Sequence, residues 1–476
     1  MPDDRPNVLF LMSDEHSFRC QSRLDEATGE PVETPALDGL ADSGTTFEQT
    51  YCPYPLCVPS RQCMLTGKEV QNCAAWANYL EPEHTTLPER FRDEGWETCL
   101  VGKMHFGGER QFVGFEHRPY GDLTGDSGEN PEPIDPEKVT TYPTRQGIDK
   151  GTRISGAGAT EIPETMLQEQ VTKNEAVAWV REQEARSEEP WFLTASFLRP
   201  HFPLTAPRRH FERYWDTEAD EPTDRLTEPK VGREGDFADH PFTAAMEAGF
   251  ETGEFDEHAV MKARAGYFAC VDYMDEILGD LLSTLQREGY LENTIVVYAS
   301  DHGEVNGEHG QWWKQAPWES SARVPMYVQT PAQRAGEAEA HAVETPASLT
   351  DLFPTLCGLV GIDAPRDIDG VDLSTAVETG AEPDRGPVVC DKFNDNWGAD
   401  VEWRMVRDGD YKYVAFRDAP ELLFDVVADP LETENLAPDA TGEDREALQR
   451  LRTFVADTVD WEENARRRER DQREFE

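Results

Sequence analysis

Residues 257–302 read EHAVMKARAGYFACVDYMDEILGDLLSTLQREGYLENTIVVYASDH, and this stretch decides the fold class of the 476-residue chain. Its first part carries mostly apolar side chains every three or four residues as far as Gly289, which predicts a long helix over 257–288. The run TIVVYAS then predicts a strand over 294–300 that is buried on both faces. A helix followed directly by such a strand is the repeating unit of a parallel α/β sheet.

The same alternation extends to both sides of this stretch. Near the N-terminus, NVLFLM at 7–12 is an unbroken apolar run, typical of another strand buried on both faces. The other predicted elements are, in chain order, a helix over 34–44, a helix over 87–94, a strand over 97–101, a helix over 164–186, a strand over 191–197, a strand over 324–329 and a helix over 346–360. We therefore predict an α/β fold with a large, mostly parallel sheet and helices on both of its faces.

The pattern changes after about residue 380. Asp-Gly and Asp-Pro turns there separate short extended runs, which lie at 387–390, 403–408, 411–416 and 421–426 and are followed by a charged helix. We predict a catalytic α/β domain over 1–380 and a C-terminal subdomain over 381–476, built of a small antiparallel sheet and a helix. Two segments, 119–163 and 218–256, look loop-like and are predicted to be surface insertions.

The charge balance is strongly acidic. The chain has 45 Lys and Arg against 95 Asp and Glu, a formal net charge of −50, and only ten of its basic residues are Lys. This charge argues against nucleic acid and anionic membranes as partners. An apolar content of 38%, with 11 Trp and 22 Phe, excludes a disordered acidic polymer. The composition predicts a halophilic protein whose surface charge is screened by molar salt, and an ordinary acidic enzyme is the alternative.

The N-terminus and the cysteines predict a reducing, cytoplasmic setting. MPDDRPNVLFLMSDEH places acidic residues before a short apolar run, where a secretion signal would have a basic start and a longer apolar stretch. No run of the sequence approaches the 18 apolar residues of a membrane span. Nine cysteines are an odd number in a long chain, which argues against a disulfide scaffold.

Polar side chains follow four of the predicted strands, at the sheet edge where ligands bind in open α/β proteins. They are Asp14 and Glu15 after strand 7–12, Lys103 and His105 after strand 97–101, His201 after strand 191–197, and Asp301 and His302 after strand 294–300. Each of these residues, taken alone, is equally well explained as a helix cap or a surface residue without a functional role. Together, the carboxylates with a single imidazole suit a hard divalent cation such as Ca²⁺, Mg²⁺ or Mn²⁺.

One further motif, CVPSRQCMLTG at 57–67, lies between these strands. It places Cys57 at the start of a probable helix opened by Pro59, with Arg61 one turn away. A helix N-terminus and an arginine both favour a thiolate, so Cys57 is either an activated nucleophile or a simple buried cysteine. Cys-x-Pro-Ser-Arg followed by Leu-Thr-Gly resembles the signature of the type I sulfatases of the alkaline phosphatase superfamily.

The resemblance runs nearly end to end, in the family's order. Its motifs are NVLFLMSDEH, TPALDGLADSGTTF, CVPSRQCMLTG, GKMHFGG, RPHFPL, SDHGEVNGEHGQWWK, ESSARVP, RMVRDGDYKY and ELLFDVVADPLETENLA. WWKQAPWESSARVP and GKMHF look most like the choline-sulfatase and iduronate-sulfatase branches. The resemblance implies an alkaline-phosphatase-like fold and a sulfuric ester hydrolase.

The resemblance also implies a cofactor chemistry for Cys57. In type I sulfatases a separate maturation enzyme oxidises the motif cysteine to formylglycine, and the hydrate of this aldehyde is the nucleophile. Similarity makes Asp14, Asp301 and His302 metal ligands along with the modified Cys57, with Ca²⁺ as the first expectation. Glu15 stands where many members have a second Asp or an amide, and it is the fifth predicted ligand.

The remaining roles follow from the same resemblance. We expect Arg61, Lys103 and Lys314 to neutralise the charged ester, and His105 to remove the proton that releases sulfate. His201 and Lys314 are expected to hold the sulfate and to protonate the leaving alcohol. Asn78, in WANYLEP, matches a substrate-binding Asn of choline-sulfatase-like and phosphonate-monoesterase-like members.

The predicted function is hydrolysis of a small sulfated substrate. One alternative is a phosphonate or phosphate ester hydrolase of the same superfamily, which uses the same nucleophile. Another is a protein that binds a sulfo-ligand without catalysis and keeps Cys57 unmodified. The metal set together with Lys103, His105 and Lys314 argues against the second alternative. The motifs leave the substrate's identity and the oligomeric state open.

Overall fold

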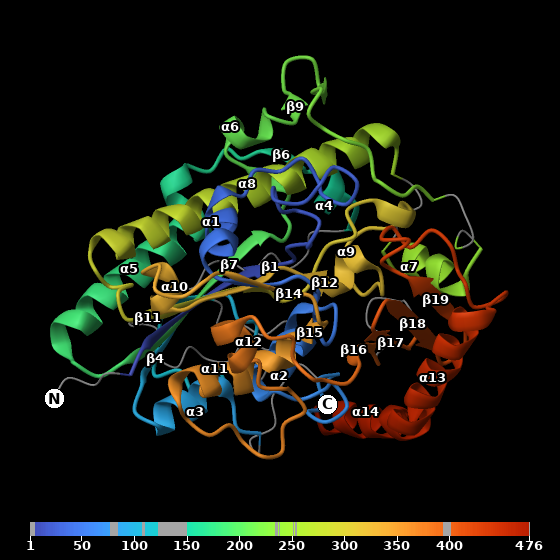
Figure 1. Cartoon of the computed structure of the whole chain (residues 1–476). Helices are drawn as coiled ribbons and strands as arrows, with labels where there is room; N and C mark the ends of the chain where they lie inside the picture. Colours follow the sequence, from blue (N-terminus) through green and yellow to red (C-terminus); the bar gives the residue numbers. More distant parts are fainter. Residues whose placement is uncertain are drawn as a thin grey trace.

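An eight-stranded sheet runs through the molecule (Figure 1). The structure, a computed structural model, describes residues 5–76, 84–106, 110–121, 150–233, 237, 239–250, 252, 255–393 and 401–475. Across the sheet, the strands are β14 (His341–Val343), β2 (Thr45–Phe47), β13 (Met326–Gln329), β11 (Thr294–Ser300), β1 (Asn7–Asp14), β7 (Trp191–Pro200), β4 (Glu97–Gly102) and β5 (His117–Gly121).

The sheet is mostly parallel, as predicted. Strand β1 pairs in parallel with β11 on one side and with β7 on the other, and β4 continues the parallel set to β5. Strand β13 is antiparallel to both β11 and β2, and β14 is again parallel to β2. All residues of β1 except Asn7 are buried, because helices cover both faces.

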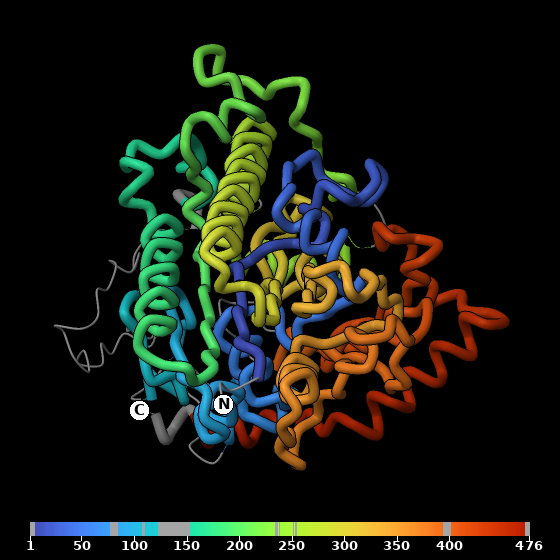
Figure 2. Tube along the Cα trace, turned by 60° about the vertical axis from the view of Figure 1, so that its left-hand side comes forward, coloured from blue at the N-terminus to red at the C-terminus, as the bar shows by residue number. Residues whose placement is uncertain are grey.

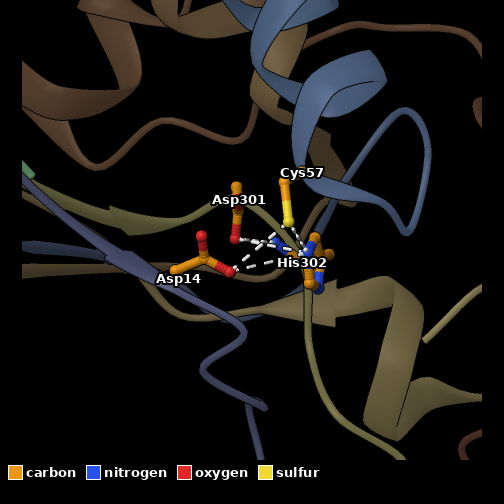
Figure 3. A group of neighbouring side chains, drawn as sticks. All are labelled: Asp14, Cys57, Asp301 and His302. Atoms are coloured by element: carbon orange, nitrogen blue, oxygen red, sulfur yellow. Dashed lines mark hydrogen bonds and ion pairs between the residues drawn. The ribbon is translucent and has the colours of Figure 1, made fainter. Parts of the chain in front are cut away.

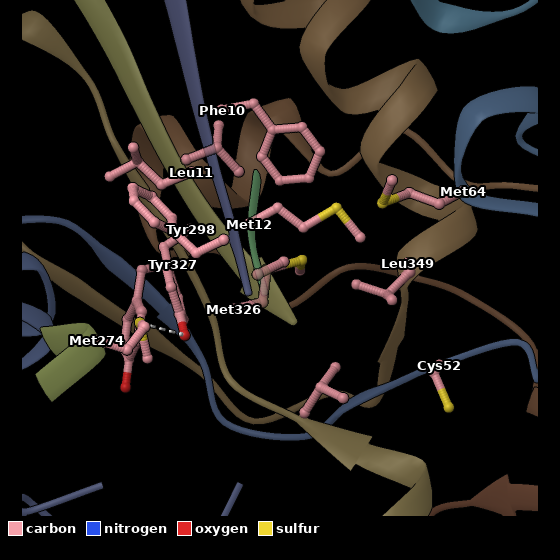
Figure 4. Close-up of a cluster of buried hydrophobic side chains, with 14 of the residues drawn as sticks. Phe10, Leu11, Met12, Cys52, Met64, Met274, Tyr298, Met326, Tyr327 and Leu349 are labelled. Carbon is pink, nitrogen blue, oxygen red and sulfur yellow. Dashed lines mark hydrogen bonds between the residues drawn. The ribbon is translucent and has the colours of Figure 1, made fainter. Parts of the chain in front are cut away.

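The helices form a layer on each face of the sheet (Figures 1 and 2). One layer contains α1 (Pro35–Ser43), α5 (Gln168–Arg186) and α8 (Glu257–Arg287), and the other contains α2 (Cys57–Thr66), α3 (Leu87–Asp93), α11 (Leu352–Val360) and α12 (Ser374–Thr379). Side chains of β1 alternate between the two cores. Leu11 lies on the same side as Tyr298 and Met274, whereas Met12 points toward Met64 of α2 (Figure 4).

The C-terminal part is a four-stranded antiparallel sheet covered by two helices, which confirms the predicted change of architecture. It contains β16 (Val388–Lys392), β17 (Trp403–Asp408), β18 (Tyr411–Phe416), β19 (Leu422–Asp425), α13 (Gly442–Thr458) and α14 (Trp461–Phe475). Its apolar core also takes in Tyr54, Cys63 and Val70 from the segment around α2. The small sheet therefore packs directly against the segment that carries Cys57.

The structure differs from the sequence prediction in segment 218–256. This segment contains a helix, α7 (Pro241–Phe250), whose Phe242 and Met246 are buried. The Phe242 ring packs 6.1 Å from Trp318 and 5.6 Å from Phe416, measured between ring centroids. The sequence analysis did not predict this helix, because its short apolar face lies in an acidic segment. The other predicted insertion, 119–163, lies mostly outside the described residues.

Two predicted element boundaries also change. The predicted strand 324–329 is divided into β12 (Arg323–Val324) and β13, which belong to different sheets, because Pro325 between them has no backbone N–H to give to a ladder. The predicted helix 346–360 starts as β15 (Ala347–Ser348) and a 3₁₀ turn, η4 (Leu349–Asp351), before α11 begins.

The remaining short elements connect these layers. They are β3 (Thr50–Tyr51), α4 (Lys150–Ser155), β6 (Gly158–Ala159), η1 (Glu164–Met166), β8 (Thr205–Ala206), α6 (Arg208–Phe211), β9 (Trp215–Asp216), β10 (Glu221–Pro222), η3 (Glu308–Gly310), α9 (Glu319–Ala322) and α10 (Pro331–Arg334). Among the described residues, no helix combines the length and the apolar character required to cross a membrane.

Candidate active site

The predicted polar residues gather where the carboxyl ends of the central parallel strands meet. Asp14 is the last residue of β1, and Asp301 and His302 follow β11 directly. Lys103 follows Gly102, the last residue of β4, whose φ of 100° and lack of a Cβ let the chain pass against the Ser196 carbonyl of β7. The topology thus brings together residues that are almost 300 positions apart.

Cys57 enters this group as the first residue of α2. The preceding residue, Leu56, is extended, so the backbone N–H groups at the positive end of the helix point toward the thiol's surroundings. At the other end, Gly67 adopts the left-handed conformation with φ of 65° and donates its N–H to the Cys63 carbonyl. All ten residues of α2 are buried, which holds Cys57 rigidly in place.

Four side chains converge on one point (Figure 3). Cys57 Sγ lies 3.3 Å from His302 Nε2 and 3.6 Å from Asp14 Oδ1. His302 Nε2 lies 3.9 Å from Asp14 Oδ1 and 3.7 Å from Asp301 Oδ1. Because all four groups are buried and each offers one ligand atom, the arrangement fits a divalent cation at their centre.

Hydrogen bonds around this cluster orient its ligand atoms. His302 Nδ1 lies 2.9 Å from the Gly303 carbonyl oxygen and donates to it, which leaves Nε2 free to face the cluster. Arg61 donates from Nε to Asp301 Oδ2 at 2.8 Å and from Nη2 to Asp14 Oδ2 at 2.9 Å. Both carboxylates are thereby turned so that their Oδ1 atoms face the cluster.

All three guanidinium nitrogens of Arg61 donate hydrogen bonds within the site. Its third nitrogen, Nη1, donates to the Lys103 carbonyl at 2.7 Å, so each guanidinium nitrogen already contacts a group of the site. Burial opposes a charged guanidinium, but Asp301 and Asp14 raise the pKa of Arg61 above its ordinary value. Arg61 therefore contacts both carboxylates of the cluster, and its predicted contact with the ester stays a prediction.

Two lysines place positive charge beside the cysteine. Lys103 Nζ lies 2.5 Å from Asp14 Oδ2 and 3.9 Å from Cys57 Sγ, and Lys314 Nζ lies 3.3 Å from the same sulfur. Burial alone would lower the pKa of Lys314, but Cys57 and the nearby carboxylates raise it above the ordinary value. The pKa of Lys103 is raised in the same way by Asp14 and Cys57. Both ammonium groups are therefore charged at neutral pH.

The same charges act on Cys57 and Asp14. Burial opposes the thiolate, but Lys103, Lys314 and His302 hold the pKa of Cys57 well below its ordinary value, with a hydrogen bond to His105 in support. Burial and Cys57 likewise oppose ionisation of Asp14, yet Lys103, His201 and Arg61 keep its pKa below the usual range. The site is thus built to hold anions next to fixed positive charge.

The histidines of the site differ in protonation. Burial, Lys103 and Lys314 lower the pKa of His201 to about 3, so its imidazole is neutral at physiological pH. For His302, burial is the largest effect and opposes the charged form, but Asp301 and Cys57 together outweigh it and raise the pKa to about 9. His105 has a backbone φ of 63° and hydrogen-bonds to Cys57, which places it beside the sulfur as expected.

Glu15 faces a different set of groups from the four-residue cluster. Its Oε2 lies 3.2 Å from Lys314 Nζ and 3.6 Å from His201 Nε2. Burial raises the pKa of Glu15 well above the ordinary value, and the neighbouring Glu304 adds to the effect against the pull of Lys314. The position of Glu15 is that of a partner for Lys314 and His201.

Sequence reasoning missed two residues that organise the site. Glu304 Oε1 accepts the backbone N–H of Asn306 at 2.9 Å and of Trp313 at 2.5 Å, so it ties together the loop that presents Lys314. Ser60 Oγ donates to the Asp301 carbonyl at 2.5 Å and joins α2 to the end of β11. Both lie inside quoted motifs, but no spacing rule reveals that their partners are backbone groups. Asn78 lies outside the described residues.

Fold and site together define a class of enzyme. A doubly covered α/β sheet presents, at one edge, a cysteine at a helix N-terminus, a buried group of side chains that could hold a metal ion and two charged lysines, which suits attack on an ester of a tetrahedral oxyanion. This is a metal-dependent hydrolase.

Comparisons with known proteins identify the family within this class. The profile of the sulfatase family matches residues 6–362, and that of the C-terminal domain of N-sulphoglucosamine sulphohydrolase matches residues 307–455. The choline-sulfatase of Rhizobium meliloti is 32% identical over 93% of this chain and 84% of its own length. An arylsulfatase of Clostridium perfringens is 27% identical over 91% of this chain and 90% of its own.

Solved structures agree on the fold. A phosphonate monoester hydrolase of Silicibacter pomeroyi superposes with a TM-score of 0.75 at 21% identity, and one of Agrobacterium radiobacter with 0.73 at 24%, each over 96% of both chains. The chain belongs to the sulfatase family and is a sulfuric ester hydrolase. The family implies a divalent metal and a sulfated small substrate.

Proposed function

We propose that this sulfatase hydrolyses sulfate monoesters with a formylglycine made from Cys57 and one divalent cation, for which Ca²⁺ is the first choice and Mg²⁺ or Mn²⁺ the alternatives. The observation that carries the proposal is the convergence of Asp14, Asp301 and His302 on Cys57 Sγ, at the N-terminus of a fully buried helix. In the mature enzyme an oxygen of the formylglycine hydrate takes the place of this sulfur atom.

The modified residue and the cation supply the chemistry that cysteine lacks. The hydrated aldehyde provides a hydroxyl nucleophile and a second hydroxyl whose deprotonation expels sulfate by carbon–oxygen cleavage. The bound cation would polarise the sulfate oxygens and stabilise the charge that develops there. The net reaction consumes one water and releases one alcohol and one sulfate.

The chain's own residues orient the ester and move protons. Lys103 and Lys314 provide fixed positive charge next to the reacting group, which stabilises the transition state without reorganisation. We assign Lys314 as the proton donor to the leaving alcohol, because its raised pKa keeps it protonated at neutral pH, whereas His201, with a pKa lowered to about 3, carries no proton to donate as an acid. His201 then serves as a neutral hydrogen-bonding group.

His105 is the proposed base of the second half-reaction. Its hydrogen bond to Cys57 places its ring where it can take a proton from a hydroxyl at that position. Glu15 holds Lys314 through the 3.2 Å ion pair, and we assign it this role instead of metal ligation. Arg61 aligns Asp14 and Asp301 through an ion pair with each carboxylate.

Mass spectrometry of the peptide that contains residue 57 tests the proposal. After co-expression with a formylglycine-generating maturation enzyme, Cys57 should be converted to formylglycine, and turnover should rise with the converted fraction. Cys57→Ala should abolish turnover and keep the fold. Cys63→Ala, on the same helix and outside the cluster, is the matched control and should stay active. An unconverted cysteine in a fully active preparation would overturn the proposal.

Parallel kinetics on aryl sulfate, aryl phosphate and phenylphosphonate with the converted enzyme test the reaction class. We expect the highest kcat/KM for sulfate, because release by carbon–oxygen cleavage needs no attack of water on a sulfate ester. A tenfold preference for phosphonate, about 1.4 kcal/mol of transition-state binding, would move the enzyme to the phosphonate hydrolases.

The proposed setting is a reducing, cytoplasmic compartment that contains the maturation enzyme. All nine cysteines are buried free thiols, which supports this setting.

A further inference from the structure

We propose that the chain with unconverted Cys57 binds Zn²⁺, a borderline-soft cation. Conversion of Cys57 to formylglycine then changes the preference of the same site to a hard divalent cation. The first half of this proposal concerns the cysteine form alone. The second half rests on the proposed function, because it needs formylglycine at position 57.

The distances between the ligand atoms match a tetrahedral zinc site (Figure 3). With Zn–S near 2.3 Å and Zn–N or Zn–O near 2.0–2.1 Å, the edges of a tetrahedron are about 3.3–3.6 Å. Cys57 Sγ lies 3.3 Å from His302 Nε2 and 3.6 Å from Asp14 Oδ1, and the edges from His302 Nε2 to the two carboxylates are 3.9 and 3.7 Å. Shifts of a few tenths of an ångström close the site.

The surroundings of the ligands support the same coordination. The Gly303 carbonyl accepts from His302 Nδ1, the hydrogen bond that typically orients a metal-binding histidine. Arg61 occupies one oxygen of each carboxylate, so Asp14 and Asp301 each offer a single Oδ1. The backbone N–H of His302 and that of Glu15 also hold Asp301 Oδ1 in place. One sulfur, one nitrogen and two single oxygens make a four-coordinate set.

The donor atoms decide between cations. A thiolate and an imidazole favour Zn²⁺, whereas Ca²⁺ takes six to eight oxygen ligands. Cys57 binds zinc as the thiolate and His302 as the neutral imidazole, and any proton that either group carries is released to the buffer on binding. In the converted chain an oxygen replaces the only sulfur, and the thiolate's negative charge is lost. Both changes lower the affinity of the site for Zn²⁺ more than its affinity for a hard cation.

The second group of possible ligands, Asp14 with Glu15 and His201, does not offer an equivalent site. Lys314 Nζ lies 3.2 Å from Glu15, and Lys103 Nζ lies 2.5 Å from Asp14. These two ammonium groups already neutralise the carboxylates of this second group. Zinc is therefore expected at the cluster of Asp14, Cys57, Asp301 and His302.

Metal analysis of the full chain, expressed without a maturation enzyme and stripped with a chelator, tests the first half. We expect one Zn²⁺ per chain by elemental analysis and an affinity at least about 100-fold above that for Ca²⁺. Co²⁺ should add a thiolate-to-cobalt charge-transfer band in the near ultraviolet. Saturating Zn²⁺ should also raise the melting temperature, because a ligand that binds only the folded state stabilises it.

Two serine variants provide the comparison. Cys57→Ser should lose the charge-transfer band and at least about tenfold of the zinc affinity. Cys63→Ser, six residues along the same helix, should keep both. Equal zinc affinity in the two variants, or Ca²⁺ that competes with Zn²⁺ at similar concentration, would overturn the proposal.

The second half is tested on converted protein, where zinc affinity should fall relative to Ca²⁺. An active converted enzyme that retains the zinc preference would overturn the switch and leave the sulfatase mechanism intact. A converted chain that shows the switch but turns over no sulfate ester would support this inference and contradict the proposed function.

Discussion

At the scale of single residues, the site owes its properties to buried charges that compensate one another. Asp14 is fully buried and stays ionised because Lys103, His201 and Arg61 lie near it, and Lys103 and Lys314 stay charged because carboxylates and Cys57 lie near them. Removing one partner leaves an uncompensated charge, which is costly in a buried site. The substitutions that test roles should therefore preserve shape.

We expect Asp301→Asn to remove metal and activity together. The amide keeps a hydrogen-bond acceptor for the backbone N–H groups of Glu15 and His302 but lacks the negative charge that the cation needs. The loss of metal affinity should exceed the 10–100-fold that losing a hydrogen-bond partner of a ligand typically causes. Elemental analysis measures the bound metal, and steady-state kinetics measures the activity. Asp391→Asn, an equally buried carboxylate in β16, should retain the metal, and a full metal complement in Asp301→Asn would refute the assignment.

A second prediction concerns His201 and pH. Burial and the two lysines lower its pKa to about 3, so the imidazole is neutral in the free enzyme from pH 5 upward and gains its proton only in strong acid. The pH profile of kcat/KM should therefore have no limb from His201 between pH 5 and 9. His201→Gln should lower kcat and leave the shape of the profile unchanged. A limb near pH 6 to 7 that disappears in His201→Gln would show that the residue titrates as an acid.

At the scale of elements, buried ion pairs connect the two sheets. Lys412 of β18 is fully buried, with its Nζ 3.1 Å from Glu319 Oε1 of α9 and 2.6 Å from Glu432 Oε1. The Glu319 N–H also donates to Glu432 Oε2 at 2.7 Å. This network, together with apolar packing of Tyr54 and Cys63 in the smaller core, favours unfolding of both parts in one transition.

Lys412→Met should destabilise the fold by about 3–5 kcal/mol, the usual result of leaving buried charge uncompensated. Urea unfolding measures this loss. As the control, Arg450→Met removes a surface partner of Asp408 and should cost at most about 1 kcal/mol, because both side chains are substantially exposed. Similar losses in the two variants would contradict the assigned role of the buried network.

The loss in Lys412→Met should also depend on pH. Burial raises the pKa of Glu432 to about 7. The nearby Glu319 adds to this increase, and Lys412 opposes it. A carboxyl whose folded pKa lies above its unfolded value contributes stability that is present at low pH and lost as the pH rises through the folded pKa. Without Lys412 this shift grows, so the deficit should be larger at pH 8 than at pH 5.

At the scale of the whole molecule, the formal net charge is −50. We expect the protein to depend on molar salt, because unscreened acidic groups repel one another across the folded surface more than in the expanded chain. Circular dichroism in dilute buffer should show partial or full unfolding that KCl reverses. An unchanged melting temperature from dilute to multimolar salt would contradict the halophilic interpretation.

The sequence alone determined the class of fold and most of its elements, and it singled out the polar residues that gather at one edge of the sheet. Apolar runs such as 7–12 and 294–300 are long enough to specify buried strands, and a residue directly after such a strand must lie at the ligand-binding edge of the sheet. The motif around Cys57 then identified the family. These signals are local, so they can be read along the chain.

Only the tertiary structure decided how these residues divide their tasks. It turned Arg61 toward Asp14 and Asp301, paired Glu15 with Lys314, revealed Glu304 and formed α7 in a segment expected to be a loop. Each outcome depends on contacts between residues distant in sequence, or on a short apolar face that gains stability only when a second sheet covers it. The distances between side chains and their burial set the pKa values of the site, and the order of residues along the chain does not specify them.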